Sequence, residues 1–265
     1  MVIVSNIRLK NVKFSYADHQ VFNDISFYLP KNKTLSIIGP TGVGKTSFLR
    51  LLNGEEDYEG EIIISGVEVK KENFEILKQY IAVVYNDNEF LTDVVKDELK
   101  YALENKNISP QDIKDKLREL NEYFGINKLL NKPISCLSLN DKTLIKILSY
   151  AVINPSYLAI DDLLINLDLR TKILLLNYLN SQNIILINVT SDMDDALFTD
   201  YTLCLYNKII AIDGKTIDVF KEEKLIKRLG LSLPFMIDLS IQLQLYGLIN
   251  KCYLNKEAMV KKLWK

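Results

Sequence analysis

Residues 39–46, GPTGVGKT, have the residue types and spacing of a phosphate-binding loop. Its glycines let backbone N–H groups converge on phosphate oxygens, and a helix that starts at the loop adds positive potential. We expect Lys45 to reach the β- and γ-phosphates and the Thr46 hydroxyl to bind Mg²⁺. The sequence thus predicts a nucleoside triphosphate site formed by Gly39, Pro40, Thr41, Gly42, Val43, Gly44, Lys45, Thr46 and Ser47.

Two further residues point to the metal and the base. Asp161 ends the apolar segment 157–160, so we expect its carboxylate beside the loop, where it can bind the metal ion. Tyr16 ends a strand-like segment, and its ring could stack on adenine, although a core position is the alternative. Asn207 and Lys208 are followed by two isoleucines rather than by the x-Asp of a guanine-reading motif. ATP with Mg²⁺ is therefore the predicted ligand.

The elements that must position these residues read as an α/β fold. Apolar and polar residues alternate over 7–27, with a break at 17–20, which predicts antiparallel strands. Apolar segment 35–38 runs straight into the loop, and 47–52 continue with helical spacing. Residues 92–151 are expected to be almost wholly helical. Buried strands are expected at 157–160, 184–189 and 203–206, with a helix at 170–179 between the first two.

Composition limits the classes of partner. The 265 residues carry 33 basic and 34 acidic side chains, a formal net charge of −1, and the basic residues are scattered. A nucleic-acid partner is therefore not expected. No stretch approaches the roughly 18 apolar residues of a membrane span, and no signal-peptide pattern is present. We expect a cytosolic or peripheral protein.

In its order of motifs the chain resembles the ATP-binding subunits of ABC transporters over nearly its whole length. An FSY segment ending at Tyr16, the phosphate (Walker A) loop, a helical insertion, a signature region beginning at Leu137-Ser138, a Walker B strand and a D-loop with Asp168 follow one another. The resemblance implies a P-loop ABC ATPase core of the α/β class. It also implies an N-terminal antiparallel β subdomain, an inserted helical subdomain and a small C-terminal domain. We expect the ATP-binding domain at 1–220, its helical subdomain at about 86–151, and a helical, dimerising appendage at 221–265.

The tail narrows this resemblance. Residues 233–235, LPF, followed by DLSIQLQLYGL at 238–248, are similar to the C-terminal domain of energy-coupling-factor ATPase subunits. That family implies an importer of a micronutrient, a vitamin or a metal ion, driven by ATP binding and hydrolysis in an ATPase dimer. The implied partners are a second ATPase subunit, a transmembrane scaffold subunit and a substrate-binding membrane subunit. The implied location is the cytoplasmic face of the cell membrane.

Three catalytic positions depart from the family pattern. Asp162 stands where the family has a catalytic glutamate, and a carboxylate withdrawn by about 1 Å can cost about 10²-fold in rate. Ser191 takes the place of the switch histidine, and the only histidine of the chain is His19. The Q-loop has no glutamine, although Asn86 could supply a shorter amide. The alternatives are that Asp162 merely caps a strand end and that Ser191 merely N-caps a helix before Met193.

The signature region lacks its paired glycines. It reads LSLND, with Ser138, Leu139 and Asn140 at the positions expected to face a partner's phosphates. Ser138 keeps a hydroxyl, but Leu139 and Asn140 impair the close backbone approach that glycine allows. We therefore hypothesise a heterodimer in which this subunit holds ATP with slow or no hydrolysis and a more intact partner does most of the chemistry. A structural pseudo-ATPase subunit and a soluble non-transport ABC protein are the alternatives.

Overall fold

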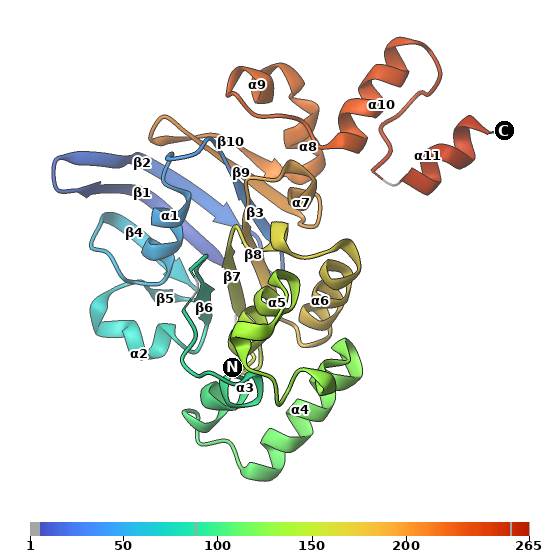
Figure 1. The fold of residues 1–265 in the computed structure, drawn as a ribbon. Helices are drawn as coiled ribbons and strands as arrows, with labels where there is room; N and C mark the ends of the chain where they lie inside the picture. The colour runs from blue at the N-terminus through green and yellow to red at the C-terminus, as the bar shows by residue number, and fades with distance from the viewer. Residues whose placement is uncertain (1–5, 88, 255, 265) are drawn as a thin grey trace.

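The computed structural model describes residues 6–87, 89–254 and 256–264. Two β-sheets form its centre (Figure 1). The smaller is antiparallel, in the order β2-β1-β4-β5, and consists of β1 (Ile7–Tyr16), β2 (His19–Leu29), β4 (Glu59–Ile64) and β5 (Val67–Glu68). Its presence confirms the predicted N-terminal antiparallel strands. The first hairpin turn is tighter than expected, because Tyr16 pairs with His19 and β2 has already begun within the predicted break at 17–20.

The larger sheet has six strands in the order β10-β9-β3-β8-β7-β6. These are β3 (Leu35–Ile38), β6 (Ile81–Val84), β7 (Tyr157–Asp161), β8 (Ile185–Val189), β9 (Tyr201–Tyr206) and β10 (Ile209–Lys215). All neighbours pair in parallel except β10 with β9. The carboxyl ends of parallel strands meet at one edge. The residues that follow β3, β7 and β8 are therefore brought together there, as a phosphate site requires.

Alternating residues of the parallel strands enter two hydrophobic clusters. One face packs against the antiparallel sheet and α1 (Lys45–Leu52), and the other packs against the helices α3 (Val95–Glu104), α5 (Leu139–Ala151) and α6 (Leu169–Ser181). In β7, for example, Ala159 belongs to the first cluster, and Leu158 and Ile160 to the second. Burial on both faces explains why these strands read as continuous apolar runs.

The inserted helices lie at one end of the large sheet (Figure 1). Between α3 and α5 comes α4 (Pro110–Phe124), which Ser109 caps by accepting a hydrogen bond from the Asp112 amide. The expectation that 92–151 is almost wholly helical is too broad. Gly125 ends α4 with φ 66°, and residues 126–138 form a loop with only two short 3₁₀ turns, η2 (Ile126–Lys128) and η3 (Ile134–Cys136). Further short elements are η1 (Lys71–Asn73), α2 (Phe74–Leu77) and η4 (Leu164–Asn166).

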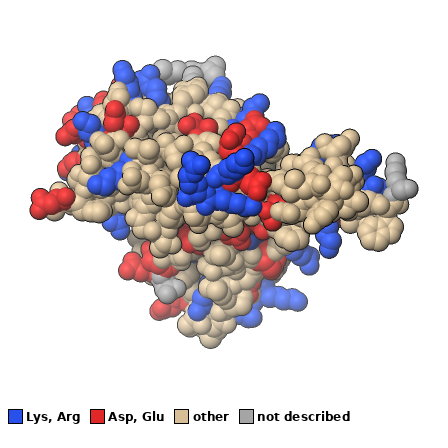
Figure 2. Space-filling view, turned by 90° about the horizontal axis from the view of Figure 1, so that it is seen from above, with Lys and Arg blue, Asp and Glu red and all other residues tan. Residues whose placement is uncertain are grey.

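The last part of the chain is helical: α7 (Met193–Ala196) follows β8, and α8 (Thr216–Lys221), α9 (Glu223–Arg228), α10 (Phe235–Leu245) and α11 (Lys256–Leu263) follow β10. A third hydrophobic cluster joins Phe220 to Ile226 and Ile237, on both sides of the expected boundary at 220/221, which stays a prediction. Figures 1 and 2 show α10 and α11 as a lobe projecting from the body, and Lys and Arg lie interspersed with Asp and Glu on the face in Figure 2. In the described part of the chain, no helix is long and apolar enough to cross a membrane.

Candidate nucleotide-binding site

At Gly39 and Gly44 the phosphate loop has no room for a side chain. Gly39, Gly42 and Gly44 have φ of 151°, 80° and 104°, which L side chains rarely adopt. A Cβ at Gly39 would lie 2.4 Å from the Leu205 carbonyl oxygen, and one at Gly44 would lie 2.6 Å from a Val21 methyl carbon. The backbone therefore passes closely over β2 and β9 before it enters α1.

Lys45 and Thr46 form the first turn of α1. The Lys45 ammonium donates hydrogen bonds to the carbonyl oxygens of Gly39 (2.7 Å) and Pro40 (3.1 Å), which holds it over the loop. Burial lowers the pKa of Lys45, and the charges of Asp162 and Asp161 act in the opposite direction. Because Lys45 is half-buried, its ammonium is less hydrated than one on the surface and loses less hydration when it binds a phosphate.

Thr46 and Asp161 come together as expected for a metal site. The Thr46 hydroxyl donates a 2.7 Å hydrogen bond to Asp161 Oδ2, and Asp161 is buried at the end of β7. Burial raises the pKa of Asp161, the hydrogen bond from Thr46 lowers it, and the neighbouring Asp162 raises it. Hydroxyl and carboxylate oxygens are the ligands that Mg²⁺ prefers, so this pair fits the ion.

Two cavities lie on either side of the loop. The phosphate cavity, of about 810 Å³, is lined by Thr41, Gly42, Gly44, Lys45, Thr46, Ser47, Arg50, Glu55, Tyr85, Asn86, Asp87, Asp161, Asp162 and Ser191. The base cavity, of about 690 Å³, is lined by Tyr16, His19, Gln20, Val21, Pro40, Thr41, Gly42, Val43, Gly44, Ser47, Tyr206, Asn207 and Lys208. The residues that the two cavities share belong to the loop or to the first turn of α1, so one extended ligand can occupy both.

Tyr16 lines the base cavity with its ring held by Phe14. The two ring centroids are 4.6 Å apart at an interplanar angle of 79°, and Tyr16 is 36% exposed. The alternative that Tyr16 is a core aromatic is therefore wrong. A ring fixed at the mouth of a cavity is suited to stacking on a base.

Asp162 and Ser191 contact each other directly. The Ser191 amide donates to Asp162 Oδ1 (2.9 Å), and its hydroxyl lies 2.9 Å from both carboxylate oxygens. The alternative role of Ser191 as a helix N-cap is wrong, because Asp192 caps α7 by accepting from the Asp194 amide. Asp162 does cap a backbone N–H, as its own alternative supposed, and its carboxylate also lines the phosphate cavity.

The signature residues lie elsewhere. Ser138 N-caps α5 by accepting from the Asp141 amide, Leu139 is 60% exposed, and Asn140 accepts a 2.9 Å hydrogen bond from the Asp168 amide. None of Ser138, Leu139 and Asn140, all within the described residues, lines the phosphate cavity of their own chain. Ser138 and Leu139 are exposed at the N-terminus of α5, and Asn140 is half-buried.

Several lining residues were missed from the sequence. Arg50 follows Thr46 by one helical turn, so the i+4 spacing could have placed it on the same face. Tyr206, Asn207 and Lys208 line the base cavity from the β9–β10 hairpin, which the Asn23 amide holds through the Lys208 carbonyl at 2.8 Å. No local sequence pattern predicts that this hairpin lines the base cavity, because its position depends on β9 pairing with β3.

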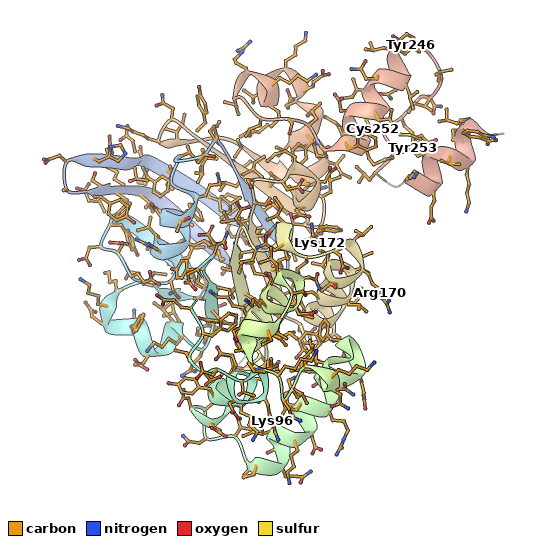
Figure 3. All side chains as sticks on the ribbon, in the orientation of Figure 1. Lys96, Arg170, Lys172, Tyr246, Cys252 and Tyr253 are labelled. Carbon is orange, nitrogen blue, oxygen red and sulfur yellow. The ribbon has the colours of Figure 1, made fainter. Side chains whose placement is uncertain are left out.

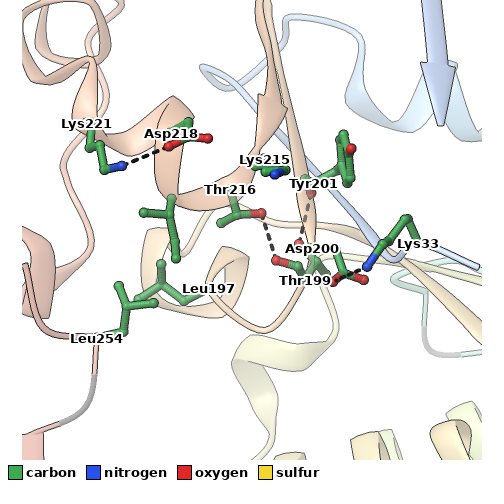
Figure 4. Close-up of a pocket in the computed structure, with 11 residues that line it drawn as sticks. Lys33, Leu197, Thr199, Asp200, Tyr201, Lys215, Thr216, Asp218, Lys221 and Leu254 are labelled. Carbon is green, nitrogen blue, oxygen red and sulfur yellow. Dashed lines mark hydrogen bonds and ion pairs between the residues drawn. The ribbon is translucent and has the colours of Figure 1, made fainter. Parts of the chain in front are cut away.

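A further cavity, of about 460 Å³, lies near α8 and shares no lining residue with the phosphate cavity (Figure 4). Two of the three lysines that line it, Lys33 and Lys221, are paired with Asp200 and Asp218, at 3.2 Å and 2.9 Å. The hydroxyl of Thr216 donates to the Thr199 carbonyl at 2.7 Å. These polar groups are satisfied within the protein, and we assign no ligand to this cavity.

A phosphate loop after a strand of a mixed sheet, a metal-binding pair, an inserted helical region and an antiparallel β sheet together define an ABC-type ATPase. A family model described as "ABC transporter" matches residues 22–164, and the chain belongs to this family. More narrowly, it is 31% identical to the energy-coupling factor transporter ATP-binding protein EcfA1 of Staphylococcus epidermidis, over 97% of each chain. The chain is thus a member of the energy-coupling-factor ATP-binding proteins, nucleotide-binding ATPases by family.

Two other comparisons agree. The chain is 29% identical to the energy-coupling factor transporter ATP-binding protein EcfA of Malacoplasma penetrans, over 97% of this chain and 92% of that one. Among solved structures, cbiO1 from Clostridium perfringens, described as part of the ABC transporter complex cbiONQ, matches with a TM-score of 0.74 and 22% identity. That match covers 86% of this chain and 95% of the other, and it supports the fold.

Proposed function

We propose that this chain is the ATP-binding subunit of an energy-coupling-factor-type ABC importer and that its own site holds Mg-ATP but hydrolyses it slowly. The observation that carries the proposal is a complete phosphate loop joined to Asp161 through Thr46, in a chain similar along its whole length to energy-coupling-factor ATP-binding proteins. Lys45 would bind the β- and γ-phosphates, and Tyr16 would stack on adenine. Bound Mg²⁺ would neutralise phosphate charge beside Thr46 and Asp161.

Slow hydrolysis follows from the groups at the γ-phosphate end of the cavity. Asp162 is one methylene shorter than glutamate, and both its oxygens accept from Ser191. The Asp162 carboxylate is therefore held against Ser191, in the segment after β8, where it would orient an attacking water poorly. Ser191 cannot extend as far as an imidazole, and Asn86 offers a shorter amide than glutamine. Each misaimed donor at a reacting phosphate typically costs about 2.7–4 kcal/mol of transition-state stabilisation.

The largely exposed signature supports a composite site with a second ATPase subunit. Ser138, Leu139 and Asn140 would face the partner's phosphate loop, and this chain's loop would face the partner's signature. We propose a non-identical, more intact partner, because two copies of this chain would form two poor sites. The appendage at 221–265 would add to this contact through its exposed side chains, including Phe235, Tyr246 and Trp264. The core domain would comprise 1–220.

The helical subdomain, about 86–151, would meet the membrane scaffold. A groove of about 440 Å³, called the docking groove below, lies between it and the sheet. It is lined by Asn53, Lys78, Ile81, Ala82, Val83, Asp87, Glu89, Leu91, Glu98, Tyr101, Ala102, Asn105, Lys106, Lys146, Ser149, Tyr150 and Ile153. The subunit would work at the cytoplasmic face of the membrane, and a substrate-binding membrane subunit would select the micronutrient, a vitamin or a metal ion.

A structural subunit without hydrolysis is the second candidate, and the grip of Ser191 on Asp162 favours it. The two candidates differ only in turnover. A soluble non-transport ABC protein is not favoured, since the relatives are named as transporter subunits.

Titration calorimetry with Mg-ATP tests the binding site. We expect the Lys45→Met variant to lose about 10- to 100-fold in affinity, because a charge-assisted contact to phosphate is removed. The matched control is Lys33→Met, which removes an exposed lysine paired with Asp200 and should leave the affinity within about twofold. Equal affinity of the wild type and Lys45→Met would reject the site.

A further inference from the structure

One short segment connects the phosphate cavity with the docking groove. We define the Q-loop segment as residues 86–92, of which residue 88 lies outside the described residues. Asn86 lines the phosphate cavity, Asp87 lines both hollows, and Glu89 and Leu91 line the groove. Asn86 and Asp87 are consecutive, so a contact that holds Asp87 in place also limits how far the Asn86 side chain can enter the phosphate cavity.

Lys146, on α5, is the group that fixes Asp87. Its ammonium donates to the Asp87 carbonyl oxygen at 2.6 Å and also bonds Oδ1 of the Asp87 side chain. The Lys146 side chain is only 6% exposed, and its ammonium lies 5.9 Å from the centroid of the Phe90 ring. A buried ammonium needs its partners, so this contact constrains both the main chain and the side chain of Asp87.

Glu98, on α3, holds the other end of the segment. Its Oε2 accepts hydrogen bonds from the amides of Leu91 (3.0 Å) and Thr92 (2.9 Å) and from the Thr92 hydroxyl (3.1 Å). Glu98 is 5% exposed. Two buried charges on two helices thus hold a loop whose backbone would otherwise be free to move.

We propose that Lys146 is a positioning residue, which sets the place of the Asn86 amide at the γ-phosphate end of the cavity by holding Asp87. Lys146 lines the groove and not the phosphate cavity, so it acts through the Q-loop segment. Because the signature residue Ser138 caps the N-terminus of α5, the same contact ties the Q-loop segment to the helix that would face the partner's nucleotide. The proposal rests on the proposed function, since it requires Mg-ATP in the cavity.

Calorimetry on the full chain tests this with Mg-ATP and Mg-ADP as the probes. Lys146→Met and Asn86→Ala are each expected to raise the ratio of the ATP to the ADP dissociation constant about fivefold, the typical weight of one net hydrogen bond. Because Lys146 acts through Asn86, the double variant should show no larger ratio than Asn86→Ala alone. A merely structural role would weaken both nucleotides equally.

Lys116→Met is the matched control, since Lys116 is also a partly buried lysine of the inserted helices, 2.9 Å from Glu119 and 5.7 Å from the Tyr178 ring. Its ratio should equal that of the wild type. If Lys146→Met does not fold, Asp87→Asn tests part of the contact, because the Asp87 side chain is 45% exposed and its loss of charge weakens the side-chain bond to Lys146. The bond from Lys146 to the Asp87 carbonyl remains, so a smaller rise in the ratio, of about twofold, is expected.

Three results would overturn the proposal. The first is a ratio within about twofold of the wild type in the folded Lys146→Met variant, below the weight of one hydrogen bond, or, where that variant does not fold, no rise at all in Asp87→Asn. The second is a full effect of Lys146→Met in the Asn86→Ala background. The third is a wild-type chain that binds no Mg-ATP, which also ends the proposed function, whereas the first two leave that function standing.

Discussion

Asp162 and Ser191 lie at the ends of two neighbouring strands, and the hydrogen bonds between them shape the chemistry of the site. The places of Asp162 and Ser191 could be predicted from the sequence, because both follow recognisable strands; that they replace a catalytic glutamate and a switch histidine is what the family resemblance implies, and it stays a prediction. The contact between them could not be predicted, since it needs β7 and β8 in register, with the Asp162 amide bonded to the Val189 carbonyl at 2.9 Å. The local sequence likewise does not predict that Asp192, rather than Ser191, caps α7.

Restoring both side chains should restore hydrolysis. In the double variant Asp162→Glu with Ser191→His, the longer carboxylate is released from Ser191 and reaches toward the attacking water. We expect kcat to rise by about 10- to 100-fold, measured as phosphate release. Asp162→Asn with Ser191→His is the control without a carboxylate and should show no gain. An unchanged kcat in the Glu–His variant would mean that other positions limit the chemistry.

Asp161 makes metal binding sensitive to acid. Burial raises the pKa of Asp161 above its ordinary value, so the carboxylate becomes protonated at a higher pH than an exposed aspartate would. A metal ligand must be deprotonated. The Mg²⁺-dependent part of the ATP affinity should therefore shrink as the pH is lowered from about 7 to about 5. In the variant Asp161→Asn, Mg²⁺ should add nothing to the ATP affinity at any pH. A wild-type ATP affinity whose Mg²⁺ dependence does not change with pH would contradict the assignment of Asp161 as a metal ligand.

At the scale of elements, the contacts made by α7 are the least expected feature. Only four residues long, α7 contacts two distant helices: Asp195 pairs with Lys172 of α6 at 2.5 Å, and Asp194 accepts from the Phe235 amide at the start of α10 at 2.9 Å. Figure 3 labels Lys172 on α6. The periodic helices and strands were predictable because each buries a regular face. These two contacts join residues far apart in the chain, so the spacing of residues in the sequence does not predict them.

Removing Lys172 should destabilise the fold. Asp195 is 2% exposed, so Lys172→Met leaves a buried carboxylate without its partner, at a cost of about 3–5 kcal/mol near neutral pH. Burial raises the pKa of Asp195, whereas Lys172 lowers it. An acid whose folded-state pKa is raised destabilises more as pH rises, so the loss should be smaller at about pH 5 than at pH 7. Urea unfolding at both values measures it.

Lys221→Met is the control for that experiment, because it removes an exposed lysine paired with Asp218. Its cost should be small, because an exposed ion pair contributes little to stability. A loss for Lys172→Met as small as that of the control would show that the Lys172–Asp195 pair does not hold α6 and α7 together.

At the scale of the whole molecule, the two-sheet core followed from periodicity, whereas the expectation of a helical appendage gave no account of how its helices pack. The alternation over the first strands and the buried parallel runs each specify a sheet face. Apolar residues lie on all sides of α10, so no preferred face predicts how it packs or which of its side chains stay exposed. Tyr246, labelled in Figure 3, is 79% exposed at the end of α10.

That exposure leads to a prediction about assembly. Tyr246→Asp should weaken binding to the proposed second ATPase subunit by at least about tenfold, because it places a charge in the proposed contact. Tyr28→Asp is the matched control, an aromatic side chain exposed on the antiparallel sheet. Both variants should keep the affinity for Mg-ATP. Equal subunit affinity of the two variants would remove the appendage from the interface.

The central claim is that this chain binds ATP more readily than it consumes it. Its most direct test is the turnover of Mg-ATP by the purified chain alone, with bound nucleotide identified by chromatography after incubation. We expect ATP to be bound and recovered largely intact, with kcat well below about 1 s⁻¹. Steady release of ADP and phosphate at about 1 s⁻¹ or faster would contradict it.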